Sequence, residues 1–337
     1  MEYVPVIIPT LNRNVHLERC IESLKKSECA DKTDLYISVD YPPSEKYEKG
    51  YDEVKDYVKT ISGFRNVYIY VQEKNLNPIN NFAFLVGKAR EQHSSFFFTD
   101  DDNEYCENAL DYVNAGLERF KEDKEIFAVC VNCYKKSYRS ERSDFCLMDR
   151  CTQYGLGMTV KQYDRIKRCI SNDMYERIWS SGRNIWKLLT RNPIGFFNMS
   201  SFIMGESPAM QDANGNATIM DYSMSIYCTM SNKLVFRPIK KHVRNWGADG
   251  SGAFTAVTSG NPLDVKITKI DISGISDQIS KEDYKVEFNW LKEIEGIKIQ
   301  SFIRAILVVY GRHFLNDRQF ERFAEKIKKL GRGGKEN

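Results

Sequence analysis

The stretch "FFFTDDDNEY", residues 96–105, places three consecutive carboxylates directly after a run of aromatic residues. An aromatic run of this kind predicts a buried strand, and unpaired carboxylates are costly to bury. We therefore expect Asp100, Asp101 and Asp102 at the mouth of a sheet and not in its core. Such a group suits a divalent cation, because Mg2+ and Mn2+ bind one or two carboxylates together with substrate phosphates. The alternative is that these aspartates cap the next helix or lie in solvent.

The elements that must position these carboxylates alternate between strand and helix over the first 135 residues. Strands are predicted at 3–10, 34–40, 66–72, 94–100 and 126–133, and helices at 14–26, 51–61, 77–92 and 107–122. This alternation predicts an α/β fold with a mostly parallel sheet and helices on both faces. Ligands of such sheets bind beyond the carboxyl ends of the strands. Thr10, Arg13, Asp40 and Asn75 fall at those ends, so they should converge with the three aspartates.

The rest of the chain has a looser pattern. Helical spacing is found over residues 162–189 and 221–230, a strand is suggested just before Glu206, and "LVFRP" is a further strand. Residues 282–294 and 299–315 are also predicted to be helical. We expect a catalytic domain over residues 1–255, with a nucleotide-sugar half to about 135 and an acceptor half over 136–255. Residues 256–337 would form a largely helical C-terminal extension.

Composition excludes several classes of protein. The chain has 337 residues, 42% of them hydrophobic, and a net charge of only +3, so nothing suggests a nucleic-acid partner. Nine scattered cysteines, with one lone C-x-x-C pair at Cys130 and Cys133, favour reduced thiols over a zinc site. No signal peptide or membrane-spanning run is predicted. We expect a cytoplasmic protein, with peripheral contact to the inner face of a membrane left open.

Four segments of the first half resemble the GT-A glycosyltransferases, in particular the inverting nucleotide-sugar enzymes of family 2. They are "VPVIIPTLNRNVHLERCIESL", "ISVDY", "KNLNPINNFAF" and "FFFTDDDNEY" with its Asp-x-Asp. The later half, with "IMDYSMS", "LVFRP" and "VRNWGADGSGAF", is similar to the N-acetylglucosaminyltransferase that initiates complex N-glycan branching. The resemblance covers roughly residues 3–255. It implies a GT-A (Rossmann-like) fold.

The resemblance also implies roles for residues. Thr10 and Arg13 would flank the nucleotide, and Asp40 would accept a hydrogen bond from the base, with a plain turn residue as the alternative. Asp100 and Asp101 would meet the ribose and the sugar. Asp102 would bind Mn2+ or Mg2+ directly. Asn75 and Asn81 would make further contacts with the donor, and loop and helix-start chemistry is the alternative for both. Arg244 would also contact the donor.

Three later features remain open at the level of sequence. His242 would be a further metal ligand or a surface histidine in a basic loop. Asp221 is the candidate general base, ahead of Glu206 and Asp212, with a plain helix cap as the alternative. The Gly-rich run "RNWGADGSGAF", residues 244–254, predicts a closing lid or an ordinary exposed loop.

Two departures from the family pattern concern the donor pocket and the base. Asn77 stands where Gly is usual, and Met220 precedes Asp221 where Glu is frequent. The first leaves the geometry of the donor pocket open, and the second leaves the identity of the base open.

The sequence therefore predicts a metal-dependent inverting glycosyltransferase, hexosyl- or N-acetylhexosaminyl-, acting in bacterial surface-polysaccharide synthesis. Its donor would be a nucleoside-diphosphate sugar, preferably UDP-linked, and its acceptor a hydroxyl of a glycan or lipid-linked molecule. The alternatives are a sugar nucleotidyltransferase, which would want glycines after the first strand, and a non-catalytic carbohydrate-binding protein. From residue 301 onward nine Lys or Arg face four Asp or Glu. We expect this basic segment to touch an anionic membrane or a partner protein, unless its helices pack on the catalytic domain.

Overall fold

The computed structural model describes residues 2–133, 144–207, 210–212, 214–252, 262–275 and 297–332. The chain divides into two compact units, each built from two stretches of sequence. The first unit contains residues 1–164 and 234–287, and the second contains residues 165–233 and 288–337. The predicted domain boundary at residue 255 stays a prediction.

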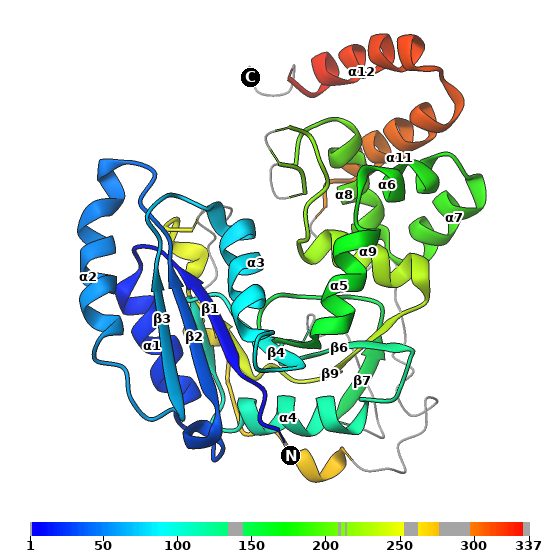
Figure 1. Ribbon diagram of the computed structural model, residues 1–337. Helices are drawn as coiled ribbons and strands as arrows, with labels where there is room; N and C mark the ends of the chain where they lie inside the picture. Colours follow the sequence, from blue (N-terminus) through cyan, green and yellow to red (C-terminus); the bar gives the residue numbers. More distant parts are fainter. Residues whose placement is uncertain are drawn as a thin grey trace. The chain divides into compact units, whose positions relative to one another are not determined.

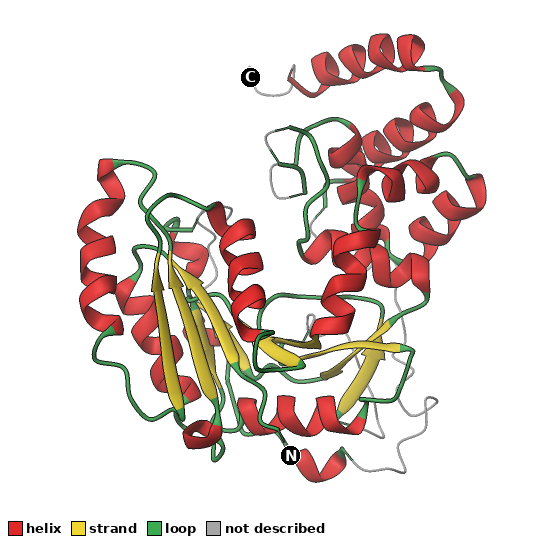
Figure 2. Ribbon diagram, viewed as in Figure 1, coloured by secondary structure: helices red, strands yellow, loops and turns green. Residues whose placement is uncertain are grey.

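The first unit is built on a sheet whose strands come in the order β3-β2-β1-β4-β8-β6-β9-β7 (Figures 1 and 2). Neighbours are parallel from β3 to β4 and between β6 and β9, and antiparallel where β8 and β7 are inserted. The strands are β1 (Val6–Thr10), β2 (Asp34–Val39), β3 (Asn66–Val71), β4 (Ser95–Phe98), β6 (Ile126–Cys130), β7 (Phe145–Met148), β8 (Leu156–Thr159) and β9 (Leu234–Pro238).

A separate two-stranded antiparallel sheet joins two segments that are far apart in sequence. It pairs β5 (Asn103–Tyr105) with β10 (Val243–Asn245), in the register Asn103 opposite Asn245. β5 follows the three aspartates directly, so this pairing brings the later Gly-rich segment to the acidic motif.

Helices cover both faces of the large sheet. Apolar residues of α1, α2 and α4 share one buried cluster with alternate residues of β1 and β2. On the other face Phe82 of α3 packs against Phe96 and Phe98 of β4, with ring centroids 6.1 and 4.5 Å apart. The helices of this unit are α1 (Asn14–Leu24), α2 (Glu48–Val58), α3 (Asn77–Ala89) and α4 (Ala109–Arg119), with α5 (Val160–Cys169) crossing into the second unit. Short 3-10 turns, η1 to η5, lie at Ala30–Lys32, Glu45–Tyr47, Gly247–Asp249, Pro262–Asp264 and Ile272–Gly274.

The named elements of the second unit are helices (Figure 2). They are α6 (Asn172–Trp179), α7 (Gly182–Arg191), α8 (Pro193–Ile203), α9 (Asp221–Ser231), α11 (Ile299–Phe314) and α12 (Asp317–Arg332). Residues Tyr175, Leu188, Phe196 and Val309 belong to one buried cluster that joins α6, α7, α8 and α11. The C-terminal helices are therefore integral to the core of this unit.

One element differs from expectation. The segment before Glu206 is the helix α8 and not a strand, because its start carries strong helix signals. Pro193 occupies the first turn, where its missing N–H costs nothing, and Asn192 Oδ1 accepts the Gly195 N–H at 2.8 Å. The predicted helix at 282–294 lies outside the described residues.

The α/β class and the mainly parallel sheet of a GT-A fold are confirmed. In the part of the chain that the structure describes, no helix is both long and apolar enough to span a membrane.

Candidate active site

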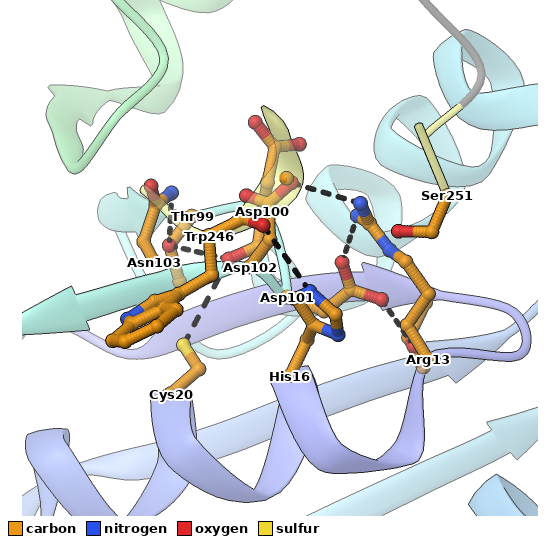
Figure 3. A network of polar contacts seen from close by, with 12 residues as sticks. Arg13, His16, Cys20, Thr99, Asp100, Asp101, Asp102, Asn103, Trp246 and Ser251 are labelled. Atoms are coloured by element: carbon orange, nitrogen blue, oxygen red, sulfur yellow. Dashed lines mark hydrogen bonds and ion pairs between the residues drawn. The ribbon is translucent and has the colours of Figure 1, made fainter. Parts of the chain in front are cut away.

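The three aspartates lie just past the carboxyl end of β4, beside the end of β1 (Figure 3). The preceding phenylalanines are buried, and so are Asp101 and Asp102, which keep 2% and 7% of their surface exposed. Thr10 at the end of β1 donates its Oγ1 hydrogen to Asp101 Oδ2 at 2.6 Å. The sheet thus buries the aromatic run and delivers the carboxylates to its edge, as the sequence predicts.

Arg13 joins the two buried aspartates. Its Nη2 donates to Asp101 Oδ1, and its Nη1 donates to Asp102 Oδ2 at 2.9 Å (Figure 3). Burial by itself would lower the pKa of Arg13, but the charges of Asp101 and Asp102 outweigh burial and raise it. The β1–α1 loop therefore supplies one fixed positive charge to a motif with three carboxylates.

The loop after β4 is fixed by its own polar groups. Thr99 Oγ1 donates to the Asp100 carbonyl at 2.8 Å and accepts hydrogen bonds from Asn103 Nδ2 and the Tyr105 hydroxyl. Cys20 Sγ donates to the same carbonyl at 3.8 Å. These hydrogen bonds fix the backbone of the loop and thereby the direction of its acidic side chains.

Asp102 has a second anchor, which the sequence reasoning missed. Asn245 Nδ2 donates to Asp102 Oδ1 at 2.7 Å, and the Trp246 N–H donates to the Asp102 carbonyl at 2.8 Å. Gly247 passes so close that a Cβ on it would clash with Asp102 Oδ2. Burial raises the pKa of Asp102, although Arg13 acts in the opposite direction. The only sequence signal was the Gly-rich composition around Asn245.

The Gly-rich segment also contacts the exposed side of α1. Arg19 stacks over the Trp246 ring, 3.9 Å from the centroid, and Trp246 Nε1 donates to Glu104 Oε2 at 3.0 Å. His16 Nε2 lies 3.3 Å from the Trp246 carbonyl and 3.2 Å from Asp249 Oδ2. Residues 253 and 254 of the predicted lid lie outside the described residues, and its closing motion stays a prediction.

Asp40 forms a second polar group at the carboxyl end of β2. Its Oδ1 accepts the N–H groups of Tyr41 and Leu76 at 2.9 and 2.7 Å. Asn75 Nδ2 lies 3.4 Å from Asp40 Oδ2 and donates more closely to the Tyr41 carbonyl, at 2.6 Å. Burial raises the pKa of Asp40, and these backbone hydrogen bonds offset only part of the rise. Asn81, buried in α3, donates to the Ser38 carbonyl at 3.2 Å.

Asn77 shows why the family's glycine position tolerates asparagine here. Its φ is +64°, in the left-handed region that favours glycine and that asparagine adopts more readily than most residues. Its Oδ1 also accepts the N–H groups of Ile79 and Asn80, both at 3.1 Å, which caps the start of α3. The side chain thus supplies a cap that glycine could not.

Two predicted site residues are not brought to the aspartates. Arg244 donates to the Val265 carbonyl at 2.7 Å and lies 3.4 Å from both carboxylate oxygens of Glu104. His242 Nδ1 lies 2.5 Å from the Thr268 carbonyl, and burial lowers its pKa. Asn245, the last residue of β10, contacts Asp102. His242 precedes Val243, the first residue of this strand, and so lies beyond its other end. Their donor and metal roles stay predictions.

The candidate bases lie in the second unit. Asp221 is the first residue of α9, half-buried in the first helical turn. Glu206 instead accepts a bidentate pair from Arg304, at 2.7 and 2.9 Å. Asp212 accepts hydrogen bonds from Asn214 and Asn216 of its own loop, which lower its pKa.

The carboxylate oxygens of the aspartates fit a divalent cation that would also bind the oxygens of a diphosphate. Asp101 and Asp102 are adjacent buried carboxylates, and Mg2+ or Mn2+ needs only one or two of these together with phosphate oxygens. Among the described residues, no group of three or more His, Cys, Asp or Glu could hold an ion alone. A closed all-protein cage is therefore not the arrangement that these residues offer.

Residues 6–172 match glycosyl transferase family 2. This segment is therefore similar to the domains of that family. The matched range begins at β1 and includes the aspartates and Asp40, so these polar groups lie within the matched segment. The match agrees with the glycosyltransferase that the sequence predicts.

Similar solved structures include other glycosyltransferases, and no curated protein matches the chain. The mannosyltransferase PcManGT from Pyrobaculum calidifontis, in complex with GDP-Man and Mn2+, is 15% identical with a TM-score of 0.35, covering 49% of this chain and 46% of that one. TarS from S. aureus is 12% identical with a TM-score of 0.36, covering 63% of this chain and 44% of that one. Its fragment 1–349 is 10% identical with a TM-score of 0.43, covering 98% and 92%. This chain thus covers less than half of the length of the first two.

Proposed function

We propose that the protein moves a sugar from a nucleoside-diphosphate donor to an acceptor hydroxyl, with inversion and with the help of a divalent cation. One observation carries this proposal. Within the segment that matches family 2, Arg13 joins Asp101 and Asp102 at the carboxyl ends of β1 and β4, where ligands of parallel sheets bind. A surplus of buried carboxylate at that edge is what a cation shared with a diphosphate requires.

The residues of the first unit would bind and orient the donor. Thr10 and Arg13 would flank the nucleotide, and Asp100 and Asp101 would meet the ribose and the sugar. Asp102 would hold Mn2+ or Mg2+, which when bound supplies positive charge to the diphosphate leaving group. Asn245 would keep the Asp102 carboxylate in place, because it donates to the Oδ1 atom at 2.7 Å.

Asp40 supports a uridine donor. The contact from Asn75 to its Oδ2 atom is long, 3.4 Å, whereas the two backbone hydrogen bonds are to Oδ1. A carboxylate oxygen can accept more than one hydrogen bond, so Oδ2 has capacity for the N–H of a uracil ring. We propose a UDP-linked hexose or N-acetylhexosamine, the latter from the motif similarity to the N-acetylglucosaminyltransferase noted above.

We propose Asp221 as the general base that takes the acceptor proton. Its position in the first turn of α9 fixes its direction, although the helix dipole lowers its basicity. The competing carboxylate Glu206 is held by a bidentate arginine, which makes it a poorer proton acceptor. The role requires an acceptor hydroxyl within hydrogen-bond reach of Asp221.

We propose a glycan or lipid-linked acceptor in bacterial surface-polysaccharide assembly, with the reaction in the cytoplasm. The nine cysteines are scattered along the sequence with no second C-x-x-C pair, which supports a reducing compartment. The family match favours transfer over the sugar nucleotidyltransferase and carbohydrate-binding alternatives.

A nucleotide-sugar screen by thermal unfolding, with and without Mn2+, tests the proposal. A true donor should raise the unfolding midpoint by several degrees only when Mn2+ is present, because ligand that binds the folded state stabilises it. Asp221→Asn should keep that shift and lose transfer by about a hundredfold or more.

Glu206→Gln is the matched control and should keep both the thermal shift and transfer. If no nucleotide sugar stabilises the protein with Mn2+, the proposed function fails. If Glu206→Gln loses transfer while Asp221→Asn retains it, the general base is wrong but the donor class stands.

A further inference from the structure

Helix α11 is apolar on two sides, but only one of them is packed in the described structure. Phe302, Ala305 and Val309 are buried in the core of the second unit. Apolar residues on another side of the helix are exposed among the described residues.

The exposed side carries a row of large apolar residues. Ile299, Ile303, Leu307 and Phe314 have 76, 52, 47 and 75% of their surface exposed. Their spacing of four, four and seven residues places them on one side of the helix. We call these four residues the α11 stripe. Single exposed hydrophobic residues need no explanation, but a contiguous row of this kind marks an interaction surface.

The neighbouring helix supplies the charge. α12, residues 317–332, contains six Lys or Arg against three Asp or Glu, a surplus as large as the net charge of +3 of the whole chain. α12 packs beside the stripe, because a Cβ on Gly311, four residues after Leu307, would lie 2.7 Å from the Phe323 ring. Arg318, Arg322 and Lys326 on α12 are exposed.

The apolar face of α12 itself is used internally. Phe320 and Ile327 keep only 8 and 6% exposure and share a cluster with Met204 and Val308. α12 therefore carries the exposed positive charge, and α11 carries the exposed apolar residues.

We propose that the α11 stripe lies on an anionic lipid surface, with the basic residues of α12 facing the headgroups. An apolar row with flanking bases is the composition of helices that lie in a membrane interface. Basic residues near an anionic leaflet add electrostatic attraction. Two copies of this chain would instead oppose like charges at the same surface, which disfavours self-association. The surface lies on one unit and does not depend on the proposed sugar transfer.

Co-sedimentation of the full chain with vesicles tests this inference. Vesicles of phosphatidylcholine with about a third phosphatidylglycerol should bind the protein, and pure phosphatidylcholine should bind it far less. The double variant Ile303→Gln and Leu307→Gln should reduce binding by roughly tenfold or more, because it removes buried apolar area. Arg322→Gln with Lys326→Gln should reduce binding mainly at low salt.

Trp186→Gln is the matched control. Trp186 is 62% exposed on α7 of the same unit, so its loss removes comparable apolar surface elsewhere. The inference is overturned if the stripe variant binds anionic vesicles as the wild type does, or if the wild type does not bind them. It is also overturned if the stripe variant abolishes a concentration-dependent dimer while vesicle binding is absent, which would assign the stripe to a second copy.

Discussion

Two groups of buried carboxylates lie at opposite ends of strands in the same sheet. Asp101 and Asp102 follow the carboxyl end of β4, and Asp34 begins β2 at its amino end. All three side chains are nearly inaccessible to solvent. They differ in how their charge is balanced, and that difference separates a structural group from a functional one.

The amino-end group is balanced. Arg65 donates to both oxygens of Asp34, at 2.7 and 2.5 Å, and Asn66 adds a third hydrogen bond at 2.9 Å. His93 lies with one ring nitrogen 3.0 Å from Asp34 and the other 3.1 Å from Glu2. Burial alone would raise the pKa of Asp34, but hydrogen bonds from Arg65, Asn66 and His93 outweigh it and lower the pKa.

The carboxyl-end group has a surplus of acid. Asp101 and Asp102 share the guanidinium of Arg13, with Asp100 next to them in the chain, and the pKa of Asp102 remains raised by burial despite that partner. A fold does not need such a surplus for stability, because unbalanced buried charge costs free energy. Sites with carboxylates perturbed in this way are candidates for ligand binding. The contrast therefore assigns function to one end of the sheet and architecture to the other.

The largest expected effect is on activity at the carboxyl-end group. Asp102→Asn should lower transfer by about a thousandfold or more, because it removes the charge that would hold the cation. Asn retains an oxygen that can accept from Asn245 and relieves repulsion with Asp101, but its amide N–H would face Arg13 Nη1. The thermal midpoint should therefore fall less than for Asp34→Asn. Turnover, Mn2+ affinity and thermal unfolding measure these effects.

Asp111→Asn is the control for that change. Asp111, in α4, accepts the Glu28 N–H at Oδ2 and the Cys29 N–H at Oδ1. Asn can keep one of these hydrogen bonds, so stability should fall somewhat, but transfer should be retained. Near-normal turnover of Asp102→Asn would contradict the contrast drawn between the two groups.

A smaller loss is expected from Gly247→Ala. The added methyl group would clash with Asp102 Oδ2 and must displace either the carboxylate or the loop. We expect Mn2+-dependent nucleotide affinity to fall about tenfold or more, since misplacing such a group by about 1 Å is costly. Gly87→Ala in α3 has open space around the new methyl group and should leave affinity unchanged. Equal affinity for both variants would show that Gly247 is not a close-approach position.

The smallest effect on activity is expected at the amino-end group. Asp34→Asn should lower the free energy of unfolding by about 2–3 kcal/mol, because an amide N–H would face the donors of Arg65 and His93. Activity per folded molecule should be unchanged. Denaturant unfolding at neutral pH measures the loss, and the exposed Asp52→Asn, paired only with Lys55, should show none.

The pH dependence of this loss follows from the lowered pKa of Asp34. A carboxyl group with a lowered pKa in the folded state stabilises the protein above its ordinary value, near 4, and loses that contribution as pH falls through the folded value. The difference in unfolding free energy between wild type and Asp34→Asn should therefore be largest at neutral pH and shrink below about pH 4. A difference that grows on acidification would contradict this assignment.

Much of the first half could be predicted from the sequence because its signals are local. The strand starting at Asp34 and the helix starting at Asn77 were predicted at their observed first residues. α8 was not, since its apolar run is as compatible with a strand until the cap formed by Asn192 and Pro193 is considered. The antiparallel insertion of β8 between β4 and β6 also carries no local signal, because it depends on pairing with distant strands.

The sequence by itself determined that three aspartates follow a buried strand, since an aromatic run must be covered and a carboxylate must reach solvent or a partner. It also placed Thr10, Arg13 and Asp40 at strand ends. Only the tertiary structure decided which partners meet. The β5–β10 pairing brings Asn245 and Gly247 to Asp102, whereas Arg244, one residue before Asn245, faces Glu104 instead. The reason is that successive side chains of a strand point to opposite faces, so register and not proximity in sequence selects the residue that reaches the carboxylate.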